Sequence, residues 1–162
     1  MKPSEVERLY GLFGHQVYVR CCYLLREKPA AMDATQDVFT ALLERFLTFP
    51  DDGRAAAWLR RVATNKCLNE LRRRRYWQSR SVEDTPDAVQ VAPFPFLEDR
   101  LLVAQLLAEI PAKKASIIVS YFMEGRTLDE AAIDNGCSVP TVRRTITAFV
   151  DKSAARVRED KS

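Results

Sequence analysis

The chain is poor in the residues that most catalytic and metal sites need. Its 162 residues include one histidine, His15, and four cysteines, none of them spaced as a CxxC pair. Zinc sites and disulfide frameworks need clustered cysteine or histidine, so neither is expected and no cofactor is predicted. A single histidine leaves acid–base and nucleophilic catalysis without its usual partner, and no GxGxxG, P-loop or GxSxG motif is present. The sequence therefore predicts a protein that is not an enzyme.

Long apolar runs are also missing. No run reaches the ~18 residues that a membrane-spanning helix needs, and the start, MKPSEVERLY, lacks the basic-then-apolar pattern of a signal peptide. The prediction is a cytoplasmic protein with no membrane span. The cysteines are then expected to be small buried hydrophobic residues, with redox sensing by the adjacent Cys21 and Cys22 as the alternative.

Charge is distributed unevenly along the chain. The net charge is +3, yet residues 1–80 carry 15 Lys and Arg against 9 Asp and Glu, whereas residues 81–162 carry 10 against 13. A polyanionic partner is therefore expected to bind the first half, especially near residues 66–80.

Apolar residues recur at three- and four-residue intervals, which predicts a helix from Val6 that ends near Lys28-Pro29 and further helices over 33–46 and 55–77. Asp33 and Gln36 have the spacing of a capping box at the start of the second helix. Its apolar stripe is expected at Val38, Phe39, Leu42, Leu43 and Phe46. The first three helices predict a small helical domain.

The periodicity stops between residues 78 and 96, where three prolines and no glycine predict an extended linker. Further helices are expected over 101–110, 112–123, 127–134 and from 139 onward, with Asn135-Gly136 as a tight turn between the last two. A short helix, a glycine turn and a long helix form the layout of a helix-turn-helix. The predicted fold is all-α, with two small helical domains joined by an extended linker.

The segment 55–77 is the most informative part of the chain. In a helix, five of its residues fall in one narrow stripe: Trp58, Arg61, Asn65, Asn69 and Arg72. Arginines neutralise phosphates, amides hydrogen-bond base edges and an exposed indole stacks on an unpaired base, so the stripe predicts a nucleic-acid surface. Two alternatives are that Trp58 is a core residue and that the arginine run 72–75 is only a solvated helix end. Other residues already supply a core face, which favours the nucleic-acid interpretation: Leu59, Val62, Ala63, Cys67 and Leu71.

The final helix offers a second candidate surface. Ser138 can cap it and Pro140 is tolerated in its first turn. The buried stripe is expected at Val139, Val142, Ile146, Phe149 and Val150. Four residues then lie exposed near the N-terminal end, where a helix-turn-helix enters the major groove: Thr141, Arg143, Arg144 and Thr147. A solvated polar face is the alternative.

Three motifs in this order resemble the extracytoplasmic-function (ECF) RNA polymerase sigma factors of the sigma-70 family. They are DATQDVFTALLERF at 33–46, AAAWLRRVATNKCLNELRRRRYW at 55–77 and IPAKKASIIVSYFMEGRTLDEAAIDNGCSVPTVRRTI at 110–146. The resemblance implies a sigma-two domain over 1–77, a linker over 78–96 and a sigma-four helix-turn-helix domain over 97–162. The first domain would dock on RNA polymerase and melt the minus-ten promoter element, and the last would bind the upstream promoter element.

The resemblance also implies roles for individual residues. In the family, the helix that matches 33–46 docks on the clamp helices of the beta-prime subunit, which here implies Asp33, Gln36, Asp37, Thr40 and Glu44. Asp33 and Gln36 are open to the alternative that they only cap the helix. The implied minus-ten surface consists of Arg54, Trp58, Arg61, Asn65, Asn69, Arg72 and Arg73. Within it, Trp58 and Asn65 would melt the promoter or capture a flipped base, while the arginines at 61, 72 and 73 would contact phosphates. Which of Asp51, Asp52 and Arg54 shape the base pocket stays open.

The chain departs from the family pattern in the last helix. Asp151 falls on the same outer face as Arg144 and Thr147, where a carboxylate would oppose DNA phosphates. The segment 139–158 still holds five basic residues against that acid: Arg143, Arg144, Lys152, Arg156 and Arg158. Upstream-element binding is therefore expected to be weak or to depend on the polymerase.

Three functions compete on these observations. The leading one is a transcription initiation factor that binds core RNA polymerase and directs it to specific promoters, and an anti-sigma factor is a common partner in this family. A sigma-like regulator that binds polymerase or another protein without initiating transcription is the alternative. A nuclease is the third, but it would need clustered carboxylates for metal ions, and the nearest candidates lie on the expected docking face.

Overall fold

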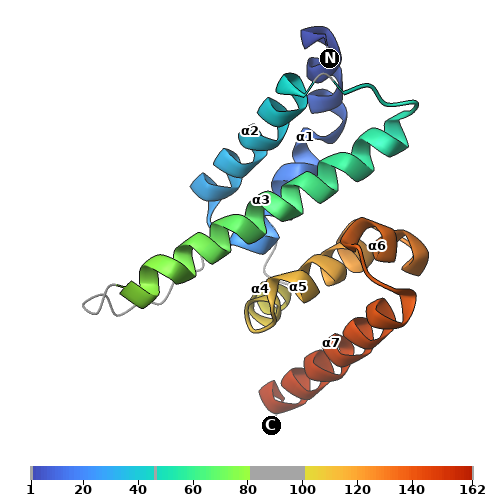
Figure 1. Ribbon diagram of the computed structural model, residues 1–162. Coiled ribbons are helices and arrows are strands. Elements are labelled where there is room, and N and C mark those ends of the chain that lie inside the picture. Colours follow the sequence, from blue (N-terminus) through green and yellow to red (C-terminus); the bar gives the residue numbers. More distant parts are fainter. Residues whose placement is uncertain (1, 46, 81–100, 162) are drawn as a thin grey trace. The chain divides into compact units, whose positions relative to one another are not determined.

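The computed structural model describes residues 2–45, 47–80 and 101–161, and the regular structure in these ranges is helical (Figure 1). The chain divides into two compact units, residues 1–101 and 102–162. This confirms the prediction of an all-α protein with two small helical domains.

The first unit contains three long helices: α1 (Pro3–Leu25), α2 (Lys28–Glu44) and α3 (Asp52–Arg80). Each contributes a fully buried leucine to a shared core, because Leu9, Leu42 and Leu59 are at most 1% exposed. Burying such a side chain stabilises the fold by roughly 1.5–3 kcal/mol. The three helices therefore form one packed unit rather than separate amphipathic segments.

The junction between α1 and α2 differs from the prediction. Arg26 takes a left-handed conformation (φ 63°) and ends α1, and Pro29 lies in the first turn of α2, where no backbone N–H is needed. Glu27 is the N-cap residue, so the predicted capping box at Asp33 and Gln36 is wrong. Both residues lie inside the helix with exposed side chains.

The core side of α2 is largely as predicted. Val38, Phe39 and Leu42 are buried. Leu43 is 42% exposed, so its expected burial is wrong, and Phe46 lies outside the described residues. The apolar stripe of α2 is thus shifted toward its N-terminal half, where Ala31, Ala34 and Thr35 are also buried.

The longest helix, α3, begins at Asp52 and extends three residues into the segment predicted as linker. Asp51 caps it, since its Oδ1 accepts the Arg54 backbone N–H at 2.7 Å. Leu59, Ala63 and Cys67 are buried, as predicted, while Val62 and Leu71 of the expected core face are only partly buried. The opposite face of α3 is consequently free to carry the polar stripe.

The cysteines are free thiols, and three of them are buried in the first unit, as predicted: Cys21, Cys22 and Cys67. Cys137, in the second unit, is only partly buried. Cys21 hydrogen-bonds Cys67, so its partner lies on α3 rather than at the neighbouring position in α1. This contact and burial raise the pKa of Cys67.

The second unit contains four shorter segments and one long helix: α4 (Leu101–Ala108), α5 (Ala112–Ile118), the π-helical turn η2 (Val119–Met123), α6 (Leu128–Asn135) and α7 (Val139–Asp160). Ser138 caps α7, as predicted, and Thr127 caps α6. Gly136 has φ +62° in the turn between them, a conformation that favours glycine. The helix-turn-helix layout is therefore present.

A small apolar cluster holds α5, α6 and α7 together. It consists of Ile117, Ala131, Ala132 and Val142, each at most 5% exposed. Beside it, Arg126 donates from Nε to Oδ2 of the buried Asp134 at 2.7 Å. The apolar cluster fixes the first half of α7 against α6, and the ion pair holds the segment that precedes α6.

Candidate nucleic-acid interface

The polar stripe of α3 is on the surface. Arg61, Asn65, Asn69 and Arg72 are exposed, whereas Trp58 is partly buried. The Trp58 ring packs on Phe49 from the preceding loop, with ring centroids 5.9 Å apart and planes tilted by 54°. Trp58 is thus neither a core residue nor a fully exposed indole, and Phe49 supports one side of its ring.

At the N-terminal end of α3, three charged residues make different contacts: Asp51, Asp52 and Arg54. Asp51 caps the helix through Arg54 N–H. Asp52 accepts two hydrogen bonds from Arg8 of α1, the shorter at 2.8 Å, and Arg8 lowers the pKa of this carboxyl. Both carboxylates therefore have structural partners, and the exposed Arg54 is the charged side chain that faces solvent beside Trp58 on the helical wheel.

The arginine run at the other end of α3 is not uniform. Arg74 donates to Glu70 at 3.2 Å, to Glu27 at 3.0 Å and to the Leu25 carbonyl at 3.4 Å. Its side chain therefore connects α3 to the end of α1. Arg73 is exposed but donates to both oxygens of Glu70, at 2.8 and 3.0 Å. Hydrogen bonds from Arg73 first, and then from Arg74, lower the pKa of Glu70.

Arg72 is held much more loosely. It is exposed, and it donates a long hydrogen bond of 3.4 Å from Nη1 to Oδ1 of Asn69. Because this bond is long and both groups are exposed, reorienting Arg72 toward a phosphate costs little. Among the predicted phosphate contacts, Arg61 and Arg72 are therefore better placed than Arg73.

The predicted polymerase-binding residues share one exposed face of α2: Asp33, Gln36, Asp37, Thr40 and Glu44. Asp33 and Asp37 also border a groove of about 470 Å³ between α2 and α3. The α3 side of this groove carries Lys66, Asn69 and Arg73. The structure thus brings together residues that the sequence assigned to two different partners.

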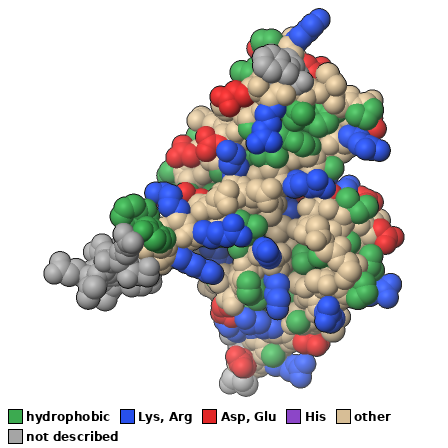
Figure 2. All heavy atoms as spheres, viewed as in Figure 1, with side chains coloured by type: hydrophobic (Ala, Val, Ile, Leu, Met, Phe, Trp, Pro, Cys, Tyr) green, Lys and Arg blue, Asp and Glu red, His purple; other side chains and the backbone are tan. Residues whose placement is uncertain are grey.

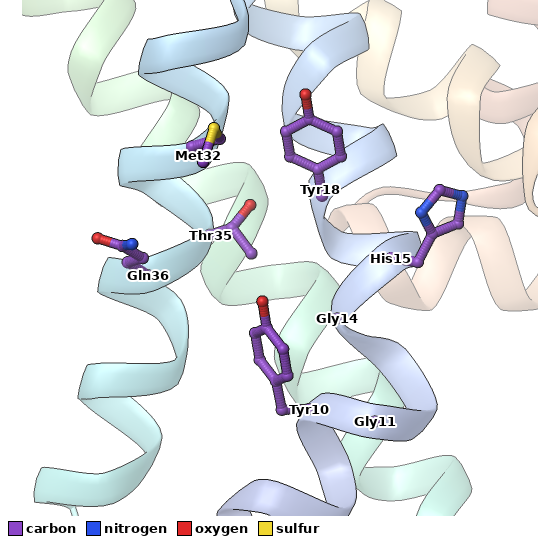
Figure 3. A pocket seen from close by; sticks show the side chains of 8 residues that line it. All are labelled: Tyr10, Gly11, Gly14, His15, Tyr18, Met32, Thr35 and Gln36. Atoms are coloured by element: carbon purple, nitrogen blue, oxygen red, sulfur yellow. The ribbon is translucent and has the colours of Figure 1, made fainter. Parts of the chain in front are cut away.

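A second groove, of about 490 Å³, lies between α1 and α2 (Figure 3). Tyr10 and Met32 line it and are more than half exposed, at 56% and 54%. Gln36 lies at its edge on α2, and Tyr10 packs edge-on against Phe39 with centroids 4.9 Å apart. The α2 face is therefore bordered by a polar groove on one side and a more apolar groove on the other.

In the second unit, Arg143, Arg144 and Thr147 are exposed on α7, as predicted, while Thr141 is partly buried. The Thr141 hydroxyl accepts from Arg144 Nη2 at 3.3 Å. Val150 is 47% exposed, so its predicted burial is wrong. The exposed cations of this surface lie in the first two turns of α7.

Farther along α7, two of the basic residues are already paired. Lys152 and Arg156 both bind Glu109, at 3.1 and 2.7 Å, and Arg156 first and then Lys152 lower the pKa of this carboxyl. Asp151 is exposed. The basic count of 139–158 therefore overstates the charge available to DNA, which fits the expectation of weak upstream binding.

Sequence reasoning missed two aromatic side chains at the end of α3. Tyr76 and Trp77 are 50% and 59% exposed, and their rings meet edge-on at 5.8 Å. The sequence does predict that Tyr76 shares the side of the helix that carries Trp58, because the two residues are 18 positions, or about five helical turns, apart.

Within residues 2–45, 47–80 and 101–161, no cluster of three His, Cys, Asp or Glu side chains could hold a metal ion. In the same ranges, none of the helices is both long enough and apolar enough to cross a membrane.

Comparison with known proteins places these surfaces in context. Residues 9–76 match the family model described as sigma-70 region 2. The chain is 28% identical over 138 residues to the ECF RNA polymerase sigma factor SigM of Mycobacterium tuberculosis, covering 85% of this chain and 69% of the relative. It is 29% identical over 143 residues to the RNA polymerase sigma-E factor of Streptomyces coelicolor, covering 85% and 75%. The sigma factor RpoE of Bartonella quintana, solved in complex with the anti-sigma factor NepR, has the same fold, with a TM-score of 0.75, 17% identity and coverage of 95% and 97%.

Proposed function

We propose that this chain, a member of the ECF group of the sigma-70 family, binds core RNA polymerase and directs it to specific promoters, which it recognises and melts. The observation that carries this proposal is the exposed stripe of α3. It combines an aromatic ring supported from one side, two exposed amides and loosely held arginines on one helix face. This family consists of transcription factors that are not enzymes.

The α3 stripe has the groups needed to hold an unpaired DNA strand. A flipped base costs a few kcal/mol of lost stacking and pairing, which an aromatic face and amide donors offset. We assign base capture or melting to Trp58 and Asn65. Arg54, Arg61 and Arg72 are assigned to phosphate contacts, and Asn69 lies on the same face. Arg73 can contact a phosphate only when its hydrogen bonds to Glu70 are broken.

The α2 face is assigned to polymerase, through the clamp helices of the beta-prime subunit. The refuted capping box supports this assignment, since Asp33 and Gln36 lie inside the helix with exposed side chains and are not needed at its end. Asp33, Asp37 and Glu44 give this face a negative charge that suits a basic partner. Gln36 and Thr40 complete it.

The second unit is assigned to the upstream promoter element, through Thr141, Arg143, Arg144 and Thr147. An anti-sigma factor is a further proposed partner, since the structural neighbour RpoE was solved with one. Because a factor of this kind acts on bacterial RNA polymerase, we propose a cytoplasmic location.

The test uses purified core polymerase and a cognate promoter. Trp58→Ala and Asn65→Ala should reduce promoter opening, measured by permanganate footprinting, more than they reduce core binding. Asp37→Lys should do the reverse, with Glu7→Lys, an exposed carboxylate on α1, as the matched control. No specific run-off transcript and no core binding by the wild type would remove the proposal.

The family membership does not favour the alternative of a sigma-like module that binds polymerase without initiating transcription. The same experiment separates the two functions, since such a module would retain core binding and leave the promoter unreactive to permanganate.

A further inference from the structure

The polar stripe of α3 continues beyond the residues assigned so far. At about 100° per residue, Tyr76 has the same angular position as Trp58, and the residues at 61, 65, 69 and 72 lie within about 60° of that line. Trp58 and Tyr76 are separated by about 27 Å along the helix axis. One face of α3 thus carries an aromatic side chain at each end, with amides and arginines between them.

The surroundings of Tyr76 suit a nucleic acid. The C-terminal part of α3 extends beyond α1 and α2, and Figure 2 shows hydrophobic side chains beside several Lys and Arg side chains at this end. Arg72 and Arg75 are exposed within one turn of Tyr76. The neighbouring Arg73 and Arg74 are bound to Glu70 and so hold the helix rather than add free charge.

Tyr76 retains a large accessible surface in the first unit. Half of its surface is accessible, and its ring meets Trp77, which is itself 59% exposed. An exposed aromatic ring beside arginines can stack on an unpaired base, since bases stack on aromatic faces while cations hold the backbone. Trp77 lies about 100° farther around the helix, toward Arg73 and away from the centre of the stripe.

We propose that Tyr76 stacks on a second unpaired base of the promoter strand, at the opposite end of α3 from the base held at Trp58. Arg72 and Arg75 contact the phosphates next to that base. This inference rests on the proposed function, because it assigns a further specificity-determining residue to the same DNA surface. A length of 27 Å corresponds to about eight nucleotides at the stacked spacing of 3.4 Å, and to fewer when the strand is extended.

The experiment measures binding of holoenzyme, assembled from core polymerase and the full chain, to fork-junction DNA. The non-template strand carries a single-stranded tail that is lengthened one nucleotide at a time up to about ten, in each polarity. The protein variants are Tyr76→Ala, Tyr76→Phe and, as the matched aromatic control off the stripe, Trp77→Ala. A second set of probes pairs the tail with a complementary strand.

For one tail polarity, wild-type affinity should rise once the tail reaches Tyr76, and Tyr76→Ala should remove that rise, a loss of about 5- to 150-fold. Tyr76→Phe should keep the rise, Trp77→Ala should keep most of it, and paired tails should show no dependence on Tyr76. Equal affinities of wild type and Tyr76→Ala at every tail length would overturn the inference, as would an equal loss on short or paired tails. If wild-type holoenzyme binds no fork probe at all, the proposed function itself fails, and thermal melting of each variant shows that it is folded.

Discussion

Replacing Arg72 by alanine should weaken DNA binding by the holoenzyme in a strongly salt-dependent way, whereas replacing Arg74 should not. Arg72 is exposed and its hydrogen bond to Asn69 is long, at 3.4 Å, while the Arg74 side chain is 26% exposed and has three partners. Each phosphate contact contributes about 0.7 to 0.9 to the slope of log K against log salt. Over a fourfold change in salt, one contact is therefore worth about a threefold change in affinity.

The measurement is a fluorescence anisotropy titration of a labelled promoter fork with holoenzyme at salt concentrations from about 50 to 200 mM. The affinity ratio of wild type to Arg72→Ala should be about three times larger at the low salt than at the high salt. Arg74→Ala should leave the slope unchanged and instead lower the free energy of unfolding, because it removes the contacts to Glu27 and to the Leu25 carbonyl. Equal slope changes in the two variants would refute the division between a DNA-contacting arginine and a structural one.

Four further outcomes follow from the structure. Asp37→Lys should lower the affinity for core polymerase about tenfold or more in a pull-down titration, since it reverses a charge on the proposed docking face. Leu59→Ala should reduce the free energy of unfolding by about 2–5 kcal/mol in urea, because this side chain is 1% exposed. Gly136→Ala should cost about 1–2 kcal/mol, seen as earlier melting of the second unit, because φ there is +62°. The pKa of Glu109 is lowered, chiefly by its hydrogen bond from Arg156, so its stabilising effect is present above its ordinary pKa of 4.5 and is lost as the pH falls through the lowered pKa. The difference in Tm between wild type and Glu109→Gln should therefore be seen at neutral pH and shrink as the pH is lowered below 4.5.

Apolar periodicity was enough to predict the helices and most of their buried faces. It succeeded at Leu59, Ala63 and Cys67 because a helix of this length has one side against its neighbours. It failed at Leu43 and Val150, where an apolar residue at the edge of a stripe finds no neighbour to cover it. Burial at such positions depends on the packing of other helices, which the local pattern does not contain.

Proline and charge pairing explain the remaining differences. Pro29 was interpreted as the end of the first helix, yet proline is equally suited to the first turn of the next one, and Arg26 supplies the break. The pairing of Glu70 with Arg73 and Arg74 follows the ordinary three- and four-residue spacing and was readable from the sequence. The pairing of Glu109 with Arg156 was not, because it joins residues 47 positions apart.

The groove between α2 and α3 limits how cleanly polymerase binding and DNA binding can be separated by mutation. Asp33 and Asp37 line it from α2, and Lys66, Asn69 and Arg73 line it from α3, so a partner docked against the carboxylates lies close to the cations. At such short range, solvent and salt screen the interaction between these charges only in part. Neutralising the carboxylates on α2 therefore changes the electrostatic potential at the cations on α3, and the reverse also holds. Trp58 and Tyr76 do not line this groove. They share a side of α3 with Asn69, but they lie about 16 and 10 Å from it along the helix axis. Substitutions at these two aromatic residues should therefore report on DNA alone, whereas those at Asp37 and Arg73 should affect both partners.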